Sequence, residues 1–354
     1  MYLDHSMIEA LHSVLPHWYD LEELTLKDCI FDGSCMLLEA IARHTAHPYR
    51  LKKISIEFCS RFEELSIFGA AHSLMSQLAK YVTKSNPMDL IKLFNVCDAE
   101  NSAASWVQAH GTVFCKNFEV ESDFICDSFN NLLISQISEN TALEQLTLVS
   151  AFALRSASVA HRLFVALRNR EANNLQSLCL SDMRIREVGF QELTAALPKL
   201  PHLQELRMDS SLHSDACHMI AEPAFLSAVQ QLPKLHLLEL GLNHLCGHGT
   251  TLLMSLVDAD GCATTQLHML KLNNTAMPIE KLIDAIDVVY RRRKYKQGKL
   301  LDIVKFGGLY FCKVDDYRLC SARKKLSTMV DVTDFAQSPC VCCIIECSDH
   351  VSVM

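Results

Sequence analysis

The chain has 354 residues and a formal net charge of -8, with 49% hydrophobic and 21% charged residues. This composition can bury a core and has too few charges for a disordered chain. The acidic balance argues against nucleic acid as the main partner, because phosphate binding needs a basic face. No apolar run is long enough to span a membrane, and residues 1–5 lack the start of a signal peptide, so we expect a cytoplasmic protein.

The first segment predicts a helix. Ile8, Leu11 and Leu15 recur at helical spacing. Repeat proteins need caps at their ends, because the last repeat otherwise leaves its core open. We therefore expect residues 1–20 to form an N-terminal helical cap.

An internal repeat occupies residues 21–306. Eight segments share apolar residues at positions one, four and six, and each predicts a short strand whose fourth and sixth residues face one side. From Leu143 onward the segments begin 28 to 34 residues apart, with a helical stretch after each strand. The eight sets are Leu21/Leu24/Leu26, Leu51/Ile54/Ile56, Leu143/Leu146/Leu148, Leu175/Leu178/Leu180, Leu203/Leu206/Met208, Leu235/Leu238/Leu240, Leu267/Leu270/Leu272 and Leu301/Val304/Phe306.

The repeat weakens between Leu51 and Leu143. Only Leu90/Leu93 and Val113/Phe118 match the pattern, and only in part. We expect degenerate repeats or an insertion in residues 61–142.

Some repeats carry a longer pattern. In the repeat that begins at Leu235, Asn243 holds position nine and Leu245 holds position eleven. This pattern resembles the L-x-x-L-x-L-x-x-N/C-x-L signature of leucine-rich repeats, and the long units with a full helix resemble the ribonuclease-inhibitor type. The resemblance covers residues 21–60 and 143–306. It implies an α/β solenoid, a horseshoe with parallel strands on the concave face and helices on the convex face.

Position nine departs from the family pattern. In the family, an asparagine at position nine forms hydrogen bonds with the backbone groups of the turn, and these asparagines stack into a ladder along the repeats. In this chain only Asn243 occupies that position. Alanine and methionine side chains cannot form these hydrogen bonds, and we therefore expect less regular turns than in the family. The other residues at this position are Cys29, Cys59, Ala151, Met183, Ser211 and Thr275.

The odd positions of the strands predict a binding surface. In such a sheet, positions three, five and seven face away from the core, and equivalent positions of adjacent strands stack into columns. Toward the C-terminus column three becomes apolar, while column five carries charges of both signs, the makeup of an interface core with a polar rim. The residues expected to touch a protein partner are Arg207, Leu237, Glu239, Met269, Lys271 and Ile303. The alternative is that the C-terminal cap covers the apolar side chains or that they pack on each other.

The basic run Arg291–Lys296 closes a helix predicted to start near Ile279. A solvated helix C-terminus explains this run, because positive charge there interacts favourably with the helix dipole. An anionic membrane surface, nuclear import or an acidic partner are the alternatives.

Residues 307–338 are expected to form a C-terminal cap, and residues 339–354 form a cysteine-rich tail. Reversible acylation of the tail would anchor a soluble protein to a membrane. Zinc binding through Cys340, Cys343, Cys347 and His350 is a weaker alternative, because closed zinc sites normally join two separated pairs. A tail without special chemistry is the third. The candidate acylation sites are Cys340, Cys342, Cys343 and Cys347.

The sequence gives little support for a catalytic function, because the chain lacks the phosphate-loop, nucleophile-elbow, zinc-protease and dinucleotide-binding motifs. We expect a monomeric, non-enzymatic protein-binding scaffold without a cofactor or metal. Peripheral membrane association through the tail or the basic run is a further alternative. The irregular repeats are similar to those of leucine-rich-repeat effectors that bacteria secrete into the host cytosol, where they act on host proteins. The alternative is a membrane-anchored adaptor, or an enzyme with its activity in residues 61–142 or the tail.

Overall fold

The computed structural model divides the chain into two units, Met1–Cys179 and Leu180–Met354, which we call unit 1 and unit 2 and describe one at a time. The structure describes residues 2–3, 5–27, 30–31, 35–45, 51–57, 70–94, 112–121, 127–149, 157–170, 173–243, 245–258, 267, 269–272, 284, 287 and 303–305.

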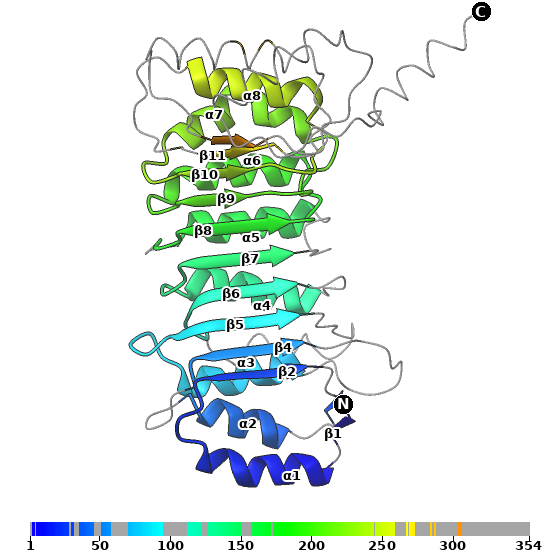
Figure 1. The fold of residues 1–354 in the computed structure, drawn as a ribbon, viewed down its shortest axis with the longest axis vertical. Coiled ribbons are helices and arrows are strands. Elements are labelled where there is room, and N and C mark those ends of the chain that lie inside the picture. The colour runs from blue at the N-terminus through cyan, green and yellow to red at the C-terminus, as the bar shows by residue number, and fades with distance from the viewer. Residues whose placement is uncertain are drawn as a thin grey trace, which may run out of the picture. The chain divides into compact units, whose positions relative to one another are not determined.

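Among these residues, ten strands form one open sheet in which they follow each other in chain order (Figure 1). The pairings from β2 to β7 and from β9 to β12 are parallel. Helices occur between the strands, and the fold therefore belongs to the α/β class. A separate two-stranded pair joins β1 (Tyr2–Leu3) to β3 (Ile30–Phe31).

Unit 1 begins with the short strand β1, and two helices then span most of the residues predicted as a cap. Its elements after β1 are α1 (His5–Val14), η1 (Leu15–His17), β2 (Glu23–Lys27), β3, α2 (Cys35–Arg43), β4 (Lys53–Glu57), α3 (Ala70–Tyr81), β5 (Met88–Phe94), β6 (Cys115–Glu121), α4 (Asp127–Glu139), β7 (Gln145–Val149) and α5 (Ala157–Arg168).

The boundary between the units falls inside β8 (Ser177–Ser181). Unit 2 continues with α6 (Glu187–Ala196), η4 (Leu197–Lys199), β9 (Glu205–Arg207), η5 (Cys217–Ala221), α7 (Pro223–Gln230), β10 (Leu237–Glu239), α8 (Cys246–Asp258), β11 (Met269–Lys271) and β12 (Ile303–Lys305).

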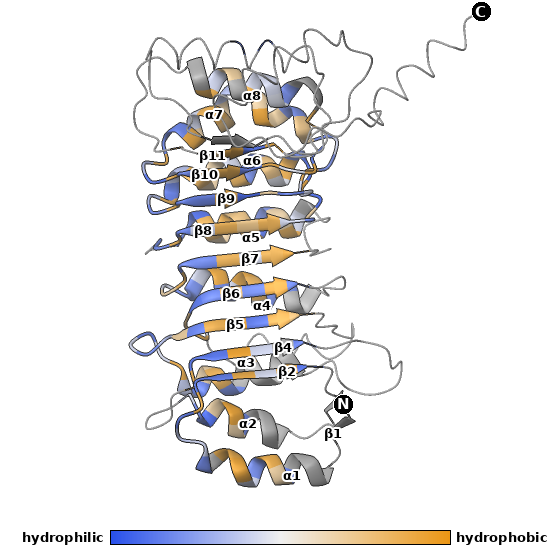
Figure 2. Cartoon of the chain, in the orientation of Figure 1, coloured by the Kyte–Doolittle hydropathy of each residue, from blue (hydrophilic) through white to orange (hydrophobic). Residues whose placement is uncertain are grey.

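Each of the eight segments predicted as a strand contains one. In the six segments that begin between Leu51 and Leu267 the fourth residue faces the core, as Leu206, Leu238 and Leu270 show by being fully buried. The register places these equivalent positions side by side, so that Leu238 pairs with Leu206 on one side and Leu270 on the other. Figure 2 shows hydrophobic colour along β7 and β8. The apolar pattern thus produces stacked layers of leucine between the sheet and the helices.

Two further strands lie where the repeat weakens. β5 pairs with β4 through Ile91 and Ile54, and β6 pairs with β7 through Phe118 and Leu146. Both strands keep the buried pattern of the repeat, with Met88 and Cys115 at position one. The described part of residues 61–142 therefore follows the repeat, while 61–69, 95–111 and 122–126 lie outside the described residues.

The turns after β9 and β10 are held by the side chains at position nine. Asn243 is buried, and its Nδ2 donates to the carbonyl oxygens of Met208 at 2.6 Å and Leu240 at 2.9 Å, while its Oδ1 accepts from the Leu212 amide at 2.8 Å. One repeat earlier, Ser211 Oγ donates to the Leu180 carbonyl. Each acceptor holds position six of the repeat before its donor, Met208 for Asn243 and Leu180 for Ser211. Ser211 therefore makes the hydrogen bond that an asparagine would make at this position.

Position eight of these turns is left-handed in three successive repeats. The φ angles are 54° at Asp182, 52° at Ser210 and 57° at Leu242. Asp tolerates this conformation better than leucine, whose Cβ crowds the backbone there. Leu242 is also 54% exposed, so the turn places a branched apolar side chain in a strained position at the surface.

Candidate functional site

The candidate site is one face of the sheet in unit 2, formed by the odd positions of β9, β10 and β11. The helices of this unit lie on the other face (Figure 1), where the position-four leucines are buried. The register places Arg207, Glu239 and Lys271 side by side in column five, and Glu205, Leu237 and Met269 side by side in column three. The predicted column assignments are therefore those of the structure.

Column five forms a network of ion pairs around one carboxylate. Glu239 Oε2 accepts from Lys271 Nζ at 2.9 Å and lies 3.9 Å from Arg207 Nε. Arg207 Nη2 in turn lies 2.9 Å from Glu205 Oε2. The side chains of Glu239 and Lys271 are only 13% and 20% exposed, so water screens this pair less than a surface pair.

Asp209, at position seven of the same face, completes the network. Burial raises the pKa of Asp209 to about 6, and the nearby charge of Glu239 adds to the rise, while the Gly241 amide and Lys271 oppose it. The carboxyl groups of Asp209 and Glu239 therefore interact directly, and Lys271 acts on Asp209 through its charge. The sequence prediction omitted Asp209, although its place at position seven was the available signal.

The apolar column differs from the expected exposed stripe. Leu237 is only 5% exposed and Met269 is half-buried. Leu237 stands between Glu205 and Met269 on the adjacent strands, where same-face neighbours are close enough to cover it. This favours the alternative that the column packs on itself. Ile303 pairs with Met269 in β12, but its side chain lies outside the described residues.

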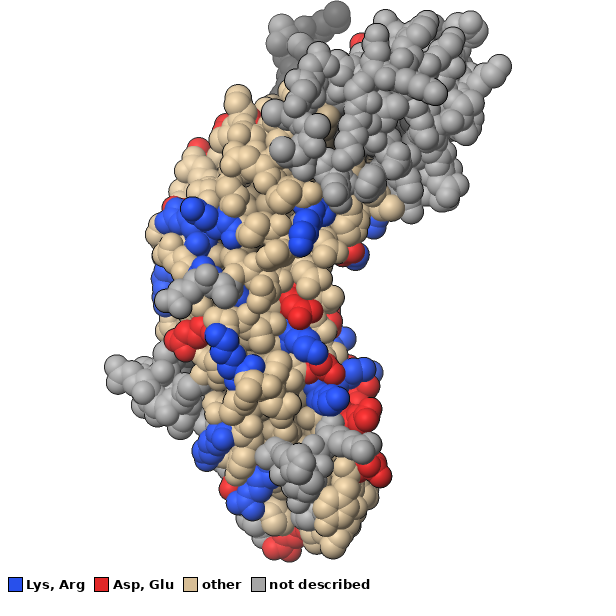
Figure 3. All heavy atoms as spheres, turned by 90° about the vertical axis from the view of Figure 1, so that its left-hand side faces the viewer, with Lys and Arg blue, Asp and Glu red and all other residues tan. Residues whose placement is uncertain are grey.

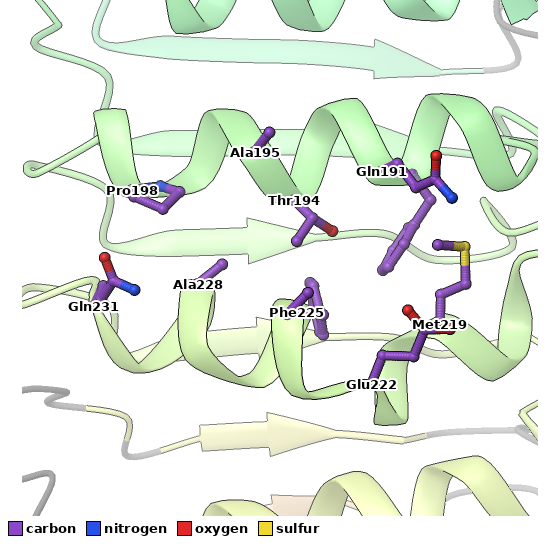
Figure 4. Close-up of a pocket in the computed structure, with 11 residues that line it drawn as sticks. Gln191, Thr194, Ala195, Pro198, Met219, Glu222, Phe225, Ala228 and Gln231 are labelled. Atoms are coloured by element: carbon purple, nitrogen blue, oxygen red, sulfur yellow. The ribbon is translucent and has the colours of Figure 1, made fainter.

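On the helical side of unit 2, a mostly apolar groove of about 330 Å³ lies between α6 and the η5–α7 segment (Figure 4). Phe190 and Phe225 form its base, with ring centroids 5.0 Å apart. Glu222 is the charged residue of its lining, and its Oε1 lies 3.5 Å from His218 Nε2. The groove thus lacks the convergent polar groups typical of a small-molecule site.

Several predicted positions fall outside the described residues. These are the basic run Arg291–Lys296 and the candidate acylation sites Cys340, Cys342, Cys343 and Cys347. Among the described cysteines, Cys115 and Cys217 are buried. Burial raises the pKa of Cys115 to about 12, so its thiol stays neutral and behaves as a small apolar group.

Over the described ranges, no cluster of three or more His, Cys, Asp or Glu side chains is arranged to hold a metal ion. In the same part of the chain, no helix combines the length and apolar character needed to cross a bilayer. Neither a protein-family model nor a curated protein matches the chain.

Proposed function

We propose that the chain is a non-enzymatic scaffold of the leucine-rich-repeat class that binds a protein partner on the face of its sheet in unit 2 that lies opposite the described helices. The observation that carries this proposal is the network of Arg207, Glu239 and Lys271, in which Arg207 is 40% exposed and the other two side chains are partly exposed. Mixed charges around a half-buried Met269 match the rim of a protein interface better than a catalytic site.

The repeat class is supported by the position-nine ladder. Asn243 makes the cross-repeat hydrogen bonds that the family signature implies for this position, and Ser211 makes the equivalent bond one repeat earlier. The burial of Leu237 changes the chemistry of the proposed interface. We expect charged contacts through Arg207 and Lys271 to determine which partner binds, and Met269 to supply the apolar contact.

Charge reversal tests this function. The whole chain and the double variant Arg207→Glu/Lys271→Glu are used to capture proteins from cytosol, and the captured proteins are compared by quantitative mass spectrometry. The matched control is Lys53→Glu, a surface lysine of column three in unit 1 that lies 3.6 Å from Glu23. Circular dichroism verifies that all three proteins are folded.

The expected result is a set of proteins captured by the wild type and by Lys53→Glu but lost from the double variant. Equal capture by all three folded proteins would contradict the assignment of this face. Rim charges act mainly on the association rate, so the affected partners should also bind more weakly at high salt.

A further inference from the structure

The first strand of the large sheet leaves one edge open in unit 1. β2 stands at the end of the strand order, and among the described residues it pairs only with β4. The Glu22 carbonyl accepts from the amides of Lys52 at 2.9 Å and Lys53 at 3.1 Å, so it points to β4. Because the backbone groups of successive strand residues point to opposite sides, those of Glu23 and Thr25 point to the open edge. Such an edge is a template for a further strand.

The exposure of the side chains shows that there is space beside this edge. Thr25, in the middle of β2, is exposed, whereas its neighbour Ser55 in β4 is only 8% exposed. On the opposite face, Leu24 and Leu26 are only half-buried, whereas Ile54, beside Leu24, is fully buried. The position in the sheet explains the difference, since β4 lies between two strands. An added strand would therefore cover apolar surface of two leucines, which favours binding.

The charges of β2 determine which strand fits beside it. In β4, Lys53 Nζ lies 3.6 Å from Glu23 Oε2, and Glu57 Oε2 lies 3.3 Å from Lys27 Nζ. The side chains of Glu23 and Lys27 are nevertheless 60% and 67% exposed, so each is accessible to a second charge. Figure 3, which faces the ends where the strands begin, shows Lys and Arg interleaved with Asp and Glu. A strand added in the same direction therefore needs the charge order of β4, basic first and acidic last.

The helices limit the shape of the occupant. Figure 1 shows α1 and α2 extending beyond β2 at this end of unit 1. An added strand needs only about 4.8 Å beside the sheet, whereas a helix is about 10 Å wide. A second copy of the chain that paired through its own β2 would bring a second set of helices into this space. A single extended peptide carries no helices and fits.

We propose that the open edge of β2 binds an extended peptide of a partner protein as an additional parallel strand. The bound segment has a basic residue beside Glu23 and an acidic residue beside Lys27. Apolar residues of the segment lie beside Leu24 and Leu26 and cover their exposed surface. Hydrogen bonds to the backbone of the edge supply affinity, and the side chains select the sequence. The site belongs to unit 1 and is independent of the function proposed for unit 2.

The test compares two fluorescein-labelled synthetic peptides that differ in their five central residues. One contains Lys-Ile-Ser-Ile-Glu, the sequence of β4, and the other contains the charge-swapped Glu-Ile-Ser-Ile-Lys. Fluorescence anisotropy measures the binding of each peptide to the whole chain. The first peptide should bind about fivefold more tightly, because it places two opposite charges rather than two like charges beside the edge. Equal binding, tighter binding of the swapped peptide, or binding of neither overturns the proposal.

Variants of β2 show whether the peptide binds at this edge. Thr25→Pro removes an amide hydrogen that points to the open edge and keeps the hydrogen bonds to β4, because proline is tolerated on edge strands. It should weaken binding of the first peptide about tenfold, while the matched control Thr25→Val keeps the amide and should bind like the wild type. Circular dichroism verifies that the variants are folded. Unchanged binding by folded Thr25→Pro overturns the site.

A second variant keeps the proposal testable if Thr25→Pro does not fold. Glu23→Gln/Lys27→Gln removes both charges of the edge and leaves its backbone intact. It should bind the two peptides equally, since nothing in β2 then distinguishes their charge order. A fivefold preference that persists in this variant overturns the proposed register.

Discussion

The side-chain amide of Asn243 donates a hydrogen bond of 2.6 Å to the carbonyl oxygen of Met208, one repeat earlier in the chain. The same amide group also donates to the carbonyls of Leu240 and Gly241 within its own turn. One buried side chain therefore connects the backbones of two successive repeats.

Replacing Asn243 with alanine should destabilise unit 2 by about 3 kcal/mol, because buried backbone groups lose their partners. Ser211→Ala removes a smaller part of the ladder and should cost about 1 kcal/mol. Urea unfolding followed by circular dichroism measures both. Asn174→Ala is the control, since Asn174 is exposed and makes one long hydrogen bond, and it should cost less than about 0.5 kcal/mol. Equal losses for Asn243→Ala and Asn174→Ala would refute the role of the ladder.

Leu242→Gly should stabilise unit 2 by about 0.5–1 kcal/mol, because glycine adopts positive φ without steric cost. Leu242 has a φ of 57° and is 54% exposed, so little core packing is lost. Leu242→Ala keeps the Cβ atom and therefore should not give this gain. If both variants change the unfolding free energy equally, backbone strain is not the cause.

Asp209 predicts that stability falls as pH rises from about 4 to about 6. Its folded-state pKa of about 6 lies above the usual value of 3.8, so the folded chain holds the proton more tightly than the unfolded chain in this window. Asp209→Asn should flatten this part of the curve and stabilise the chain at pH 7 by about 1 kcal/mol, a figure reduced for partial exposure.

Removal of Lys271 should strengthen the fall in stability with pH that Asp209→Asn is expected to flatten. Lys271 opposes the rise in the pKa of Asp209, so Lys271→Met should extend the fall in stability to higher pH. Urea unfolding at a series of pH values measures both variants. A slope that is the same in wild type and Asp209→Asn would exclude this carboxyl group as the source.

The ion pair of Glu239 and Lys271 should be stronger than an exposed pair of the same type. A double-mutant cycle with Glu239→Gln and Lys271→Met should give a coupling free energy of about 1 kcal/mol, because both side chains are largely buried. The comparison is Lys27 with Glu57 in unit 1, where the lysine is 67% exposed and the N–O distance is 3.3 Å. That cycle should give about 0.3 kcal/mol, and an equal or larger value would contradict the role of burial.

The strands could be predicted from sequence because each depends on a few residues of its own segment. Leu235, Leu238 and Leu240 indicate one buried side of a strand, and the following helix supplies the other half of the core. β5 and β6 were harder to place, since Met88 and Cys115 occupy the position where the clear repeats have leucine. The burial of these two residues shows that their size and apolar character were sufficient.

The site was only partly predictable, because exposure on a sheet face depends on neighbouring strands. The columns placed Glu239 beside Lys271 as the register has them. The burial of Leu237 depends on what stands on either side of it, which a single strand pattern does not contain. The raised pKa of Asp209 likewise depends on its burial in the folded chain and on Glu239, 30 residues later in the sequence.

The sequential order of the strands also governs how this chain can fold. Within the described sheet, each strand pairs with the strands that come before and after it in the chain. The loops that must close are therefore about one repeat long, however long the whole chain is, and short loops carry a low entropic cost. Strands near the N-terminus can pair during synthesis while the C-terminal repeats are still on the ribosome, and each new repeat then adds to an existing edge.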